Sequence, residues 1–438
     1  MVQSHTLKAR SIYLERLIAF QDTPLVKVIT GIRRCGKSSL LMLMQEYLLK
    51  SGICKECIIA MNFESLQFQR MSYNDLYEYV SKQIHPHKHY YLFFDELQRI
   101  AGWENAINSF RVDFDCDIYI TGSNSYLLSS EYSTYLSGRY VEIKMYPLSF
   151  AEFITFLGYH LTNYKTPLGE IKKRVINTHG DIVELRELFD AYMRYGGMPG
   201  IADIALEQDK VMTLLDGIYS TVVVRDILER EKRRGQARIN NAELLRKIIS
   251  SLADNIGNTT SLNSVSNTLV AENMLKNQHK RCTPATQTIA SYVRALQESY
   301  LFYEAKRFDI KGKEHLKTLG KYYIVDIGLR NYVLGFRDRD RGHALENVMY
   351  FELLRRGYDV SVGKFDSFEV DFVATNATET LYVQVTESMR EESVRKRELR
   401  PLQKIPDNYK KIVVTLDTAL DDDYDGILVK DIMQWLLH

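Results

Sequence analysis

The feature that most constrains the fold of this chain is a glycine-bounded loop between a short apolar run and a helical stretch. The run Val26–Thr30 is β-branched, as in a buried strand, and residues Ser39–Leu49 are typical of a helix. Between them lies the segment GIRRCGKS, residues 31–38, which fits the pattern G-x-x-x-x-G-K-[ST]. Because strand, loop and helix follow one another, the pattern predicts a phosphate-binding loop rather than a chance glycine turn.

Each part of this loop has a chemical role toward a nucleoside triphosphate. Gly31 and Gly36 let the backbone approach phosphate closely, while the loop amides and the helix N-terminus supply partial positive charge. We expect Lys37 to reach the β- and γ-phosphates and Ser38 to hold Mg²⁺ through its hydroxyl. The expected cofactors are therefore ATP and Mg²⁺. The expected nucleotide-binding residues are Gly31, Arg33, Arg34, Cys35, Gly36, Lys37, Ser38 and Ser39.

Two acids follow an apolar run in the segment YYLFFDE, residues 90–96. This run predicts a buried strand, and ligands of doubly wound sheets bind at the C-terminal ends of strands. Asp95 is then the second group that holds Mg²⁺, and Glu96 orients and polarises the attacking water. The alternative is a strand end with two exposed acids, which the preceding phosphate-binding loop disfavours.

Polar residues beyond a further strand are candidate sensors of the γ-phosphate. Ser123 or Asn124 follows the strand 116–121 and could bond the γ-phosphate or the water, although an ordinary polar turn is the alternative. Arg139 precedes the strand 140–145 and could pair with the γ-phosphate in its own subunit or across a homo-oligomer interface. A surface arginine without such a role is the other reading of Arg139.

The first part of the chain resembles a known family. A strand intervenes between the loop strand and the Asp-Glu strand, as in the AAA-like, additional-strand branch of P-loop ATPases. With LSGR at 136–139 and YPLSFAEF at 146–153, the chain resembles prokaryotic AAA-type ATPases that carry a C-terminal domain of unassigned function. The resemblance implies an α/β P-loop NTPase over residues 1–155, with Walker A and Walker B motifs and ATPase activity.

The middle of the chain is predicted to contain a helical extension over residues 156–235 and a winged-helix-like domain over 236–335. In the second of these, three helical stretches precede two strands, and such folds often place their last helix in a DNA major groove. Double-stranded DNA is therefore an expected partner; a winged helix that only packs against protein is the alternative. The basic side chains expected to favour phosphate are Arg294, Lys306, Arg307, Lys311, Lys313 and Lys317.

Residues 336–438 resemble the small α/β core of restriction-endonuclease-like nucleases. That family places Glu on a helix, Asp on a strand, and then Glu or Gln, any residue and Lys on the next strand; its acids hold Mg²⁺ and its Lys helps to activate water. Glu346, Asp371 and Gln384 match and form a possible second metal site, but Thr386 stands at the lysine position. Since threonine has no positive charge, an active nuclease and a degenerate fold that docks DNA or protein both remain open.

Composition limits the remaining choices. The 438 residues are 45% hydrophobic with a net charge of +1, so several domains with cores are expected and any nucleic-acid surface must be local. Five cysteines without a disulfide pattern, a polar N-terminal segment and the lack of a membrane-spanning apolar run predict a cytoplasmic protein with no membrane partner. The leading hypothesis is ATP hydrolysis as a switch coupled to DNA, and the alternative is a regulatory ATPase that binds a protein partner.

Overall fold

The structure divides into two compact units. It is a computed structural model that describes residues 7–123, 138–167, 169–204, 206–229, 239, 241–271, 276–277, 280–281, 286–316, 319–337, 340–417 and 422–438. The first unit extends to residue 146 and includes residues 298–300; the second comprises residues 147–297 and 301–438. The first unit thus ends somewhat before the boundary predicted at residue 155.

A five-stranded sheet, in which every strand is parallel to its neighbours, organises the first unit. Its order is β2-β3-β4-β1-β5, so β4 lies between the loop strand β1 and the Asp-Glu strand β3. Every residue of β1 and β3 is buried, as expected for central strands that are covered on both faces. This sheet agrees with the predicted P-loop NTPase fold. The strands are β1 (Val26–Thr30), β2 (Ile58–Asn62), β3 (Tyr90–Asp95), β4 (Cys116–Gly122) and β5 (Tyr140–Lys144).

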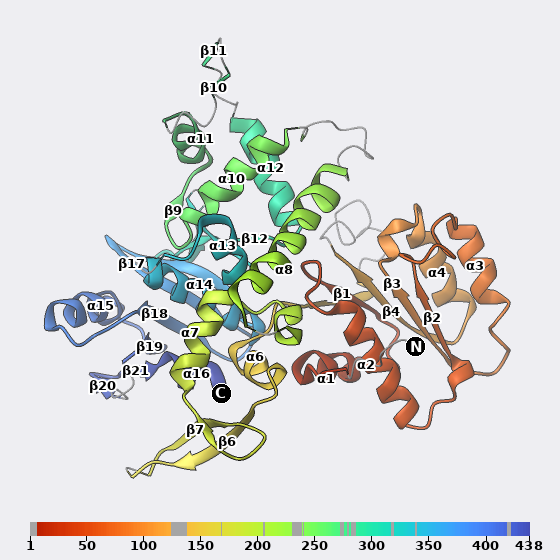
Figure 1. Ribbon diagram of the computed structural model, residues 1–438, viewed down its shortest axis with the longest axis horizontal. Coiled ribbons are helices and arrows are strands. Elements are labelled where there is room, and N and C mark those ends of the chain that lie inside the picture. Colours follow the sequence, from red (N-terminus) through yellow and green to blue (C-terminus); the bar gives the residue numbers. More distant parts are fainter. Residues whose placement is uncertain are drawn as a thin grey trace. The chain divides into compact units, whose positions relative to one another are not determined.

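Helices cover both faces of this sheet (Figure 1). Helices α3 (Tyr73–Ser81) and α4 (Trp103–Asp113) place their apolar side chains against one face, in a core shared with β1 to β4. Helices α1 (Ser11–Ala19) and α2 (Lys37–Lys50) lie on the other face. The strands are held between these two helical layers, and the loop after β1 emerges at the C-terminal edge of the sheet. Two 3₁₀ turns complete this unit, η1 (Lys55–Cys57) and η2 (Leu97–Arg99).

A buried ion pair joins β1 to β4 near the N-terminal ends of both strands, away from the loop. Lys27 contacts the carboxylate of Asp117 and also donates to the Thr23 carbonyl oxygen at 3.1 Å. The Tyr119 hydroxyl donates to the second Asp117 oxygen at 2.8 Å. Burial lowers the pKa of Lys27, and the neighbouring Asp117 opposes this shift. The pair therefore holds two charges in the interior only because each compensates the other.

The second unit begins with α6 (Phe150–Phe156), and a small antiparallel sheet follows it. The helical extension predicted over residues 156–235 is therefore wrong in its first part. These strands are mostly polar and half-exposed, so they carry no apolar alternation that would reveal them in the sequence. The Gln434 side chain fixes the sheet, because it accepts from the Lys173 amide and donates to the Lys173 carbonyl, both at 2.9 Å. The strands are β6 (His160–Lys165), β7 (Ile171–Ile176) and β8 (Ile182–Val183).

Helices dominate the next part of this unit. The ends of two of them meet where Asp326 accepts from the Gly197 amide at 2.7 Å and from the Leu329 amide at 3.1 Å. A Cβ at Gly328 would lie 1.9 Å from the Tyr195 carbonyl oxygen, so this close approach requires glycine. The elements are α7 (Leu185–Tyr195), η4 (Pro199–Asp203), α8 (Gln208–Ser220), the π-helical η5 (Thr221–Glu229), α10 (Ala242–Asp254), α11 (Leu262–Ala271), α12 (Thr286–Glu298) and α13 (Ile327–Leu334).

Two further groups of strands accompany these helices. A three-stranded antiparallel sheet has the order β12-β15-β9, and a short pair β10-β11 lies between α11 and α12 in the chain. Apart from β10, β11 and the two strands within residues 307–315, which belong to other sheets, the chain order is α10, β9, α11, α12, β12 and β15. The strands are β9 (Thr259–Thr260), β10 (Lys276–Asn277), β11 (Lys280–Arg281), β12 (Phe302–Ala305) and β15 (Gly320–Ile324).

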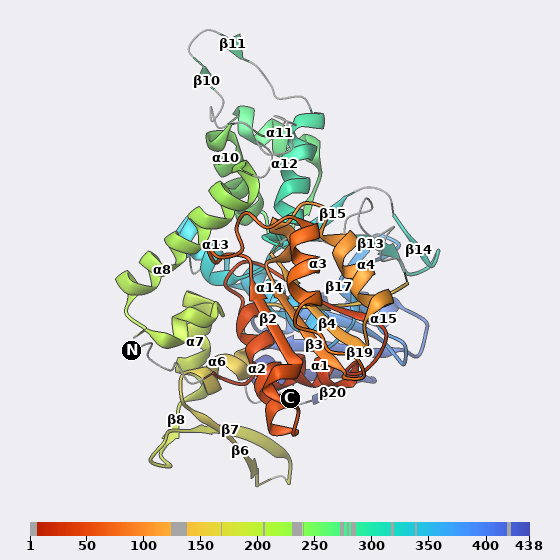
Figure 2. The ribbon, with the colours of Figure 1, turned by 90° about the vertical axis from the view of Figure 1, so that its right-hand side faces the viewer.

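An eight-stranded sheet with the order β14-β13-β16-β17-β18-β19-β21-β20 forms the rest of the unit. Because β13 and β14 pair with this sheet beside β16, the domain boundary predicted near residue 335 does not separate the two regions. Figures 1 and 2 place α10 to α12 and β6 to β8 at opposite ends of the unit. The elements are β13 (Arg307–Asp309), β14 (Glu314–His315), α14 (Arg341–Arg355), β16 (Asp359–Phe365), β17 (Phe368–Thr375), β18 (Thr380–Thr386), α15 (Glu392–Lys404), β19 (Lys410–Thr415), β20 (Asp422–Tyr424), β21 (Ile427–Asp431) and α16 (Ile432–Leu437).

Across the residues that the structure describes, every helix is too short or too polar to cross a lipid bilayer.

Lys27→Met is expected to lower the local stability of β1 and β4 by about 3–5 kcal/mol, because it leaves a buried Asp117 without its counter-charge. Native-state hydrogen exchange of the amides of both strands measures this change. Lys50→Met is the matched control: its pair with Glu46 spans 3.8 Å on the surface and contributes about 0–1 kcal/mol. Equal effects of the two substitutions would contradict the role assigned to Lys27.

Candidate active site

The loop between β1 and α2 turns back over the end of β1 and needs glycine at two positions. Gly31 has a φ of 144°, and Gly36 at the start of α2 has a φ of 104°. A Cβ on Gly31 would lie 2.1 Å from the carbonyl oxygen of Met145, the residue that follows β5. The loop therefore runs directly against the segment that follows β5, and a side chain at position 31 would not fit.

Lys37 is the first residue of α2, and its side chain folds back into the loop. The side chain is buried, and Nζ donates to the carbonyl oxygens of Gly31 at 3.0 Å and Ile32 at 3.1 Å. Both acceptors are neutral, so the ammonium charge adds to the positive potential of the loop amides and the helix N-terminus. This is a site that favours a polyanion such as a triphosphate.

Asp95 lies at the end of β3 and is fixed on both of its carboxylate oxygens. Thr121 of β4 donates to one oxygen at 2.6 Å, and the Asn62 amide of β2 donates to the other at 2.9 Å. Burial raises the pKa of Asp95, whereas hydrogen bonds from Thr121 and Ser38 oppose the shift. The predicted magnesium pair, Ser38 and Asp95, is thus brought together at the mouth of the loop.

Glu96 is also buried, and its backbone has a φ of 56°, in the left-handed region that few non-glycine residues adopt. Its amide donates to the hydroxyl of Thr121 at 3.0 Å. Its carboxylate accepts from Gln98 at 2.7 Å and from Ser123 at 3.3 Å. Local strain at a polar position is typical of functional sites, because the surrounding contacts hold the side chain in one direction.

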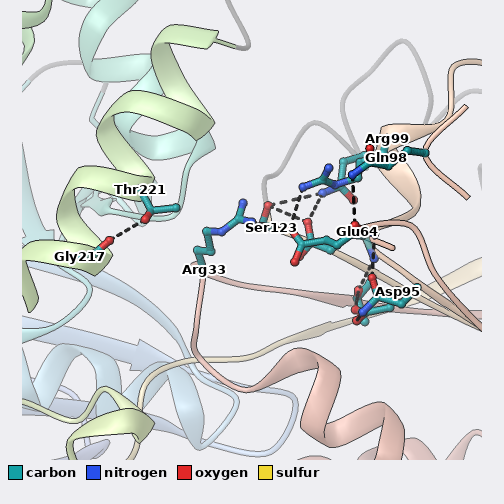
Figure 3. Close-up of polar contacts among 12 residues, drawn as sticks. Arg33, Glu64, Asp95, Gln98, Arg99, Ser123, Gly217 and Thr221 are labelled. Atoms are coloured by element: carbon teal, nitrogen blue, oxygen red, sulfur yellow. Dashed lines mark hydrogen bonds and ion pairs between the residues drawn. The ribbon is translucent and has the colours of Figure 1, made fainter. Parts of the chain in front are cut away.

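A bridge of one carboxylate and two guanidinium groups lies beside the loop (Figure 3). Glu64 accepts from Arg33 of the loop and from Arg99, both at 2.6 Å and at the same carboxylate oxygen. Arg33 is therefore held away from the loop interior by a partner that follows β2. The sequence did not assign a role to Glu64 or Arg99.

The remaining loop residues differ in their exposure. Arg34 and Ser38 are exposed, whereas Cys35 is buried. The Cys35 carbonyl accepts from buried Arg10 at 3.0 Å, and the same guanidinium nitrogen donates to the Tyr146 carbonyl at 2.8 Å. Arg10 thereby ties the loop to the segment that follows β5, and Cys35 contributes its backbone rather than an accessible thiol.

The structure describes only one of the two predicted γ-phosphate sensors. Asn124 lies outside the described residues. Arg139 immediately precedes β5, and its carbonyl accepts from the amide of Val26, the first residue of β1, at 2.9 Å. The glycine-bounded loop leaves the other end of β1. Each of the five residues of β1 adds about 3.3 Å to the distance between the two ends. The prediction that Arg139 contacts the γ-phosphate of its own chain is therefore wrong, while a role across a homo-oligomer interface stays a prediction.

A second polar cluster lies in the second unit, where α14 meets β15 and β17. The Lys321 ammonium of β15 is 2.9 Å from Glu346, 2.9 Å from Glu369 and 3.8 Å from Asp371. The Tyr323 hydroxyl donates to Glu346 at 2.5 Å. The predicted acids Glu346 and Asp371 thus come together, but they do so around an ammonium group that the sequence did not assign to them.

Gln384 joins the same cluster through Asp371. The Asp371 amide donates to the Gln384 side-chain oxygen at 3.3 Å, and the Gln384 amide group donates to Glu398 at 3.0 Å. Thr386 donates to the Ser388 carbonyl at 3.3 Å and supplies no charge, as expected. In the described part of the chain, no group of three or more His, Cys, Asp or Glu residues has an arrangement suited to a metal ion.

The charges of this cluster depend on one another. Burial raises the pKa of Asp371 to about 8, with a further contribution from the charge of Glu346. Burial also acts to raise the pKa of Glu346, but hydrogen bonds and the Lys321 charge hold it below its ordinary value. Burial and the Glu346 charge therefore favour the protonated form of Asp371, while Lys321 supplies the positive charge beside the other acids.

Several of these partners were missed for identifiable reasons. Asn62 pairs with Asp95 in the register of β2 and β3, so a polar residue at the end of β2 was a usable signal. Gln98 and Glu64 lie in loops and could not be placed from their spacing. Lys321 and Glu346 are far apart in the sequence, and only the tertiary fold brings them into contact.

Comparisons with known proteins agree with the architecture of the first unit. An AAA domain family matches residues 23–154, and a Domain of unknown function (DUF8612) matches residues 186–340. The glycine-bounded loop, the paired acids and the parallel sheet thus define an AAA-type P-loop ATPase domain.

Two uncharacterized proteins are similar over nearly the whole chain. One from Haemophilus influenzae is 40% identical over 439 residues, which cover 99% of this chain and 100% of that protein. One from Methanocaldococcus jannaschii is 28% identical over 415 residues, with coverage of 93% and 85%. This chain belongs to the family of the Haemophilus influenzae protein.

Solved structures give more distant likenesses. A Walker-type ATPase of Pyrococcus abyssi has a TM-score of 0.49 at 14% identity, covering 74% of this chain and 95% of that one. An Orc1 protein of Aeropyrum pernix in complex with DNA scores 0.30 at 13% identity, covering 75% and 92%. The RuvB Holliday junction branch migration motor of Thermotoga maritima scores 0.31 at 15% identity, covering 68% and 90%.

Lys321→Met is expected to destabilise the second unit by about 3–5 kcal/mol at neutral pH, because it leaves buried carboxylates without a cation. The folded-state pKa of Asp371 lies above its ordinary value, so its contribution to stability is present in acid and is lost as pH rises through about 8. Without Lys321 the loss should grow with pH, because the acids then need protons to stay buried.

Thermal unfolding of the natural chain, Lys321→Met and Lys311→Met between about pH 5 and pH 9 measures this effect. Lys311→Met is the control, since the pair of Lys311 with Asp366 at 3.3 Å is on the surface. A loss of stability in Lys321→Met that does not change with pH would rule out the proposed charge balance.

Proposed function

We propose that this chain binds Mg²⁺-ATP and hydrolyses it as a switch coupled to double-stranded DNA. One observation carries the ATPase part. The hydroxyl of Thr121 donates to Asp95 at 2.6 Å and accepts from the Glu96 amide at 3.0 Å, so two acids of different role are fixed side by side. They lie at the edge of the sheet from which the glycine-bounded loop emerges.

The residues of the loop fit a nucleotide with its magnesium ion. The Ser38 hydroxyl and the Asp95 carboxylate are hard oxygen donors, and Mg²⁺ in phosphate sites uses one or two such groups beside water and phosphate oxygens. When bound there, Mg²⁺ neutralises charge on the β- and γ-phosphate oxygens. Lys37 exchanges its carbonyl acceptors for phosphate oxygens, which stabilises the charge that develops on the γ-phosphate.

Glu96 acts on the attacking water. Its carboxylate orients the water and accepts a proton from it, while Gln98 and Ser123 hold the carboxylate in place. The other expected contacts to the nucleotide come from Arg33, Arg34, Cys35 and Ser39, of which the buried Cys35 contributes backbone atoms. Arg33 becomes available only when it leaves Glu64.

The order α10, β9, α11, α12, β12 and β15, with β9 and β12 on either side of β15, supports the proposal of a winged helix. Basic side chains lie on and after its last helix, and positive charge near a helix favours the phosphate backbone. Of these, Arg294, Lys306, Lys311 and Lys313 are exposed, Arg307 is half-buried, and Lys317 lies outside the described residues.

A regulatory ATPase whose C-terminal region binds a protein is the second candidate. The order α14, antiparallel β16 to β18, α15 and parallel β19 supports a restriction-endonuclease-like fold, with Glu346, Asp371 and Gln384 at matching positions. The Lys321 ammonium lies 2.9 Å from Glu346 and 3.8 Å from Asp371, where a metal ion would bind in an active nuclease. This internal cation favours a weak or inactive nuclease, and with it a docking role for the C-terminal region.

Glu96→Gln is expected to preserve nucleotide affinity but to lower turnover by about 10²–10⁴-fold, because the amide cannot accept the proton of the water. Phosphate release is measured with and without double-stranded DNA. DNA should raise the turnover of the natural chain and of the control Glu78→Gln, which changes an exposed acid on α3.

The outcomes separate the candidates. Turnover that needs Glu96 but ignores DNA would replace the DNA switch by the protein-binding role. Unchanged turnover in Glu96→Gln would contradict the catalytic role of this residue.

A further inference from the structure

A cavity of about 380 Å³ lies within the second unit, outside both clusters described above. It is formed by the C-terminal part of α7, the middle of α13, residues 336–337 after α13 and the first turn of α14; these helices lie side by side in Figure 1. Most of its lining belongs to the stretch that matches a domain of unknown function. The side chains that matter for its chemistry are Asp190, Arg194, Arg330, Phe336, Arg337 and Arg341.

The lining of the cavity therefore contains four arginines and one acidic residue, Asp190. Three of the four make ion pairs with acids: Arg341 with Asp190 at 2.5 Å, Arg330 with Asp340 at 2.9 Å and Arg337 with Asp254 at 2.6 Å. Each guanidinium has five N–H donors, so these contacts use only part of its capacity. The positive charges are thus positioned by the fold while donors remain for a ligand.

Arg341 has the clearest such donor. Its Nε is buried without a hydrogen-bond acceptor and lies 3.9 Å from a carboxylate oxygen of Glu387. A buried donor that is not hydrogen-bonded costs free energy, which an anionic oxygen in the cavity would recover. Oxygens of a phosphate suit the planar fork of arginine better than a point charge would.

The first turn of α14 adds to the positive potential. Asp340 precedes this 15-residue helix but makes no capping hydrogen bond to it, because its side chain turns to Arg330. Arg341 and Ala344 of the first turn line the cavity. Backbone N–H groups at such a helix start favour a bound anion.

One wall of the cavity is aromatic and exposed. Phe336 is 49% exposed, and the Arg194 guanidinium lies 5.3 Å from its ring centroid. An exposed ring beside arginines is a platform on which a nucleobase stacks. The volume falls at the lower end of the roughly 300–1,000 Å³ typical of small-ligand sites, as expected for one nucleotide.

We propose that this cavity binds the phosphate of a single nucleotide, with the base against Phe336. The nucleotide is either free or the terminal residue of a nucleic-acid strand, since both present the same chemistry. The proposal rests on the proposed function for its link to nucleic acid, but it does not require ATP hydrolysis. It places a second phosphate site in the chain, separate from the glycine-bounded loop.

Binding of a labelled single-stranded oligonucleotide with a 5′-phosphate tests the proposal, against the same oligonucleotide with a 5′-hydroxyl. Fluorescence anisotropy is measured with the full chain carrying Lys37→Ala, so that the ATP loop does not contribute. The phosphorylated form should bind at least about tenfold more tightly, as expected for a charged hydrogen-bonded group. Thymidine monophosphate should displace it if free nucleotides are ligands, and should fail to do so if only strand ends are.

Substitutions then assign the binding to the cavity. Arg341→Gln should remove most of the preference for the phosphate, and Phe336→Ala, at an exposed position, should weaken binding of both oligonucleotides without loss of folding. Lys396→Gln removes an exposed charge on α15 that does not line the cavity, and should change nothing.

Equal binding of the two oligonucleotides, or an unchanged preference in Arg341→Gln, would overturn the proposal. Binding of a labelled acidic peptide that is lost in Arg341→Gln, without binding of the phosphorylated oligonucleotide, would assign the cavity to a protein partner and overturn the proposal as well. Phosphate-dependent binding, combined with a natural chain that shows no ATP turnover, would leave this site intact and refute only the ATPase.

Discussion

The active-site geometry of this chain depends on the hydroxyl of Thr121. It bonds to the Asp95 carboxylate and to the Glu96 amide, so a single atom of β4 sets the position of both acids. This is possible only because β4 is inserted between β3 and β1, which also brings the loop after β1 to the same sheet edge. The additional strand is therefore the structural reason that the residues proposed to bind phosphate, hold Mg²⁺ and activate water lie at one sheet edge.

The second unit uses buried charge differently. Lys321 contacts Glu346 and Glu369 from within the chain, and burial raises the pKa of the neighbouring Asp371. The acids of this cluster thus meet a cation that the chain itself supplies, whereas Arg341 Nε at the cavity is buried without a hydrogen-bond acceptor. The proposed phosphate ligand would supply that acceptor.

Sequence reasoning could group the residues of the proposed ATP site because their signals are local. Loop, strand and paired acids each occupy a few consecutive residues, and parallel strands bring their C-terminal ends together without further information. The fold of the hairpin β6-β7 could not be predicted, because polar strands held by Gln434 show no apolar alternation. The role of Lys321 could not be predicted either, because Lys321 lies on β15 while the acids that it contacts lie on α14 and β17. The prediction that Arg139 contacts the γ-phosphate of its own chain was wrong for a topological reason. Arg139 precedes β5 and the glycine-bounded loop follows the parallel strand β1, so the two lie at opposite edges of the sheet.

The central claim, that the loop and Asp95 bind nucleotide and metal together, is tested most directly by calorimetric titration of ATP with and without Mg²⁺. The natural chain should bind ATP more tightly when Mg²⁺ is present. Asp95→Asn should retain ATP binding but lose most of this difference, and Lys37→Ala should lose binding in both conditions. Affinity that is the same with and without Mg²⁺ in the natural chain, or that survives Lys37→Ala, would contradict the account.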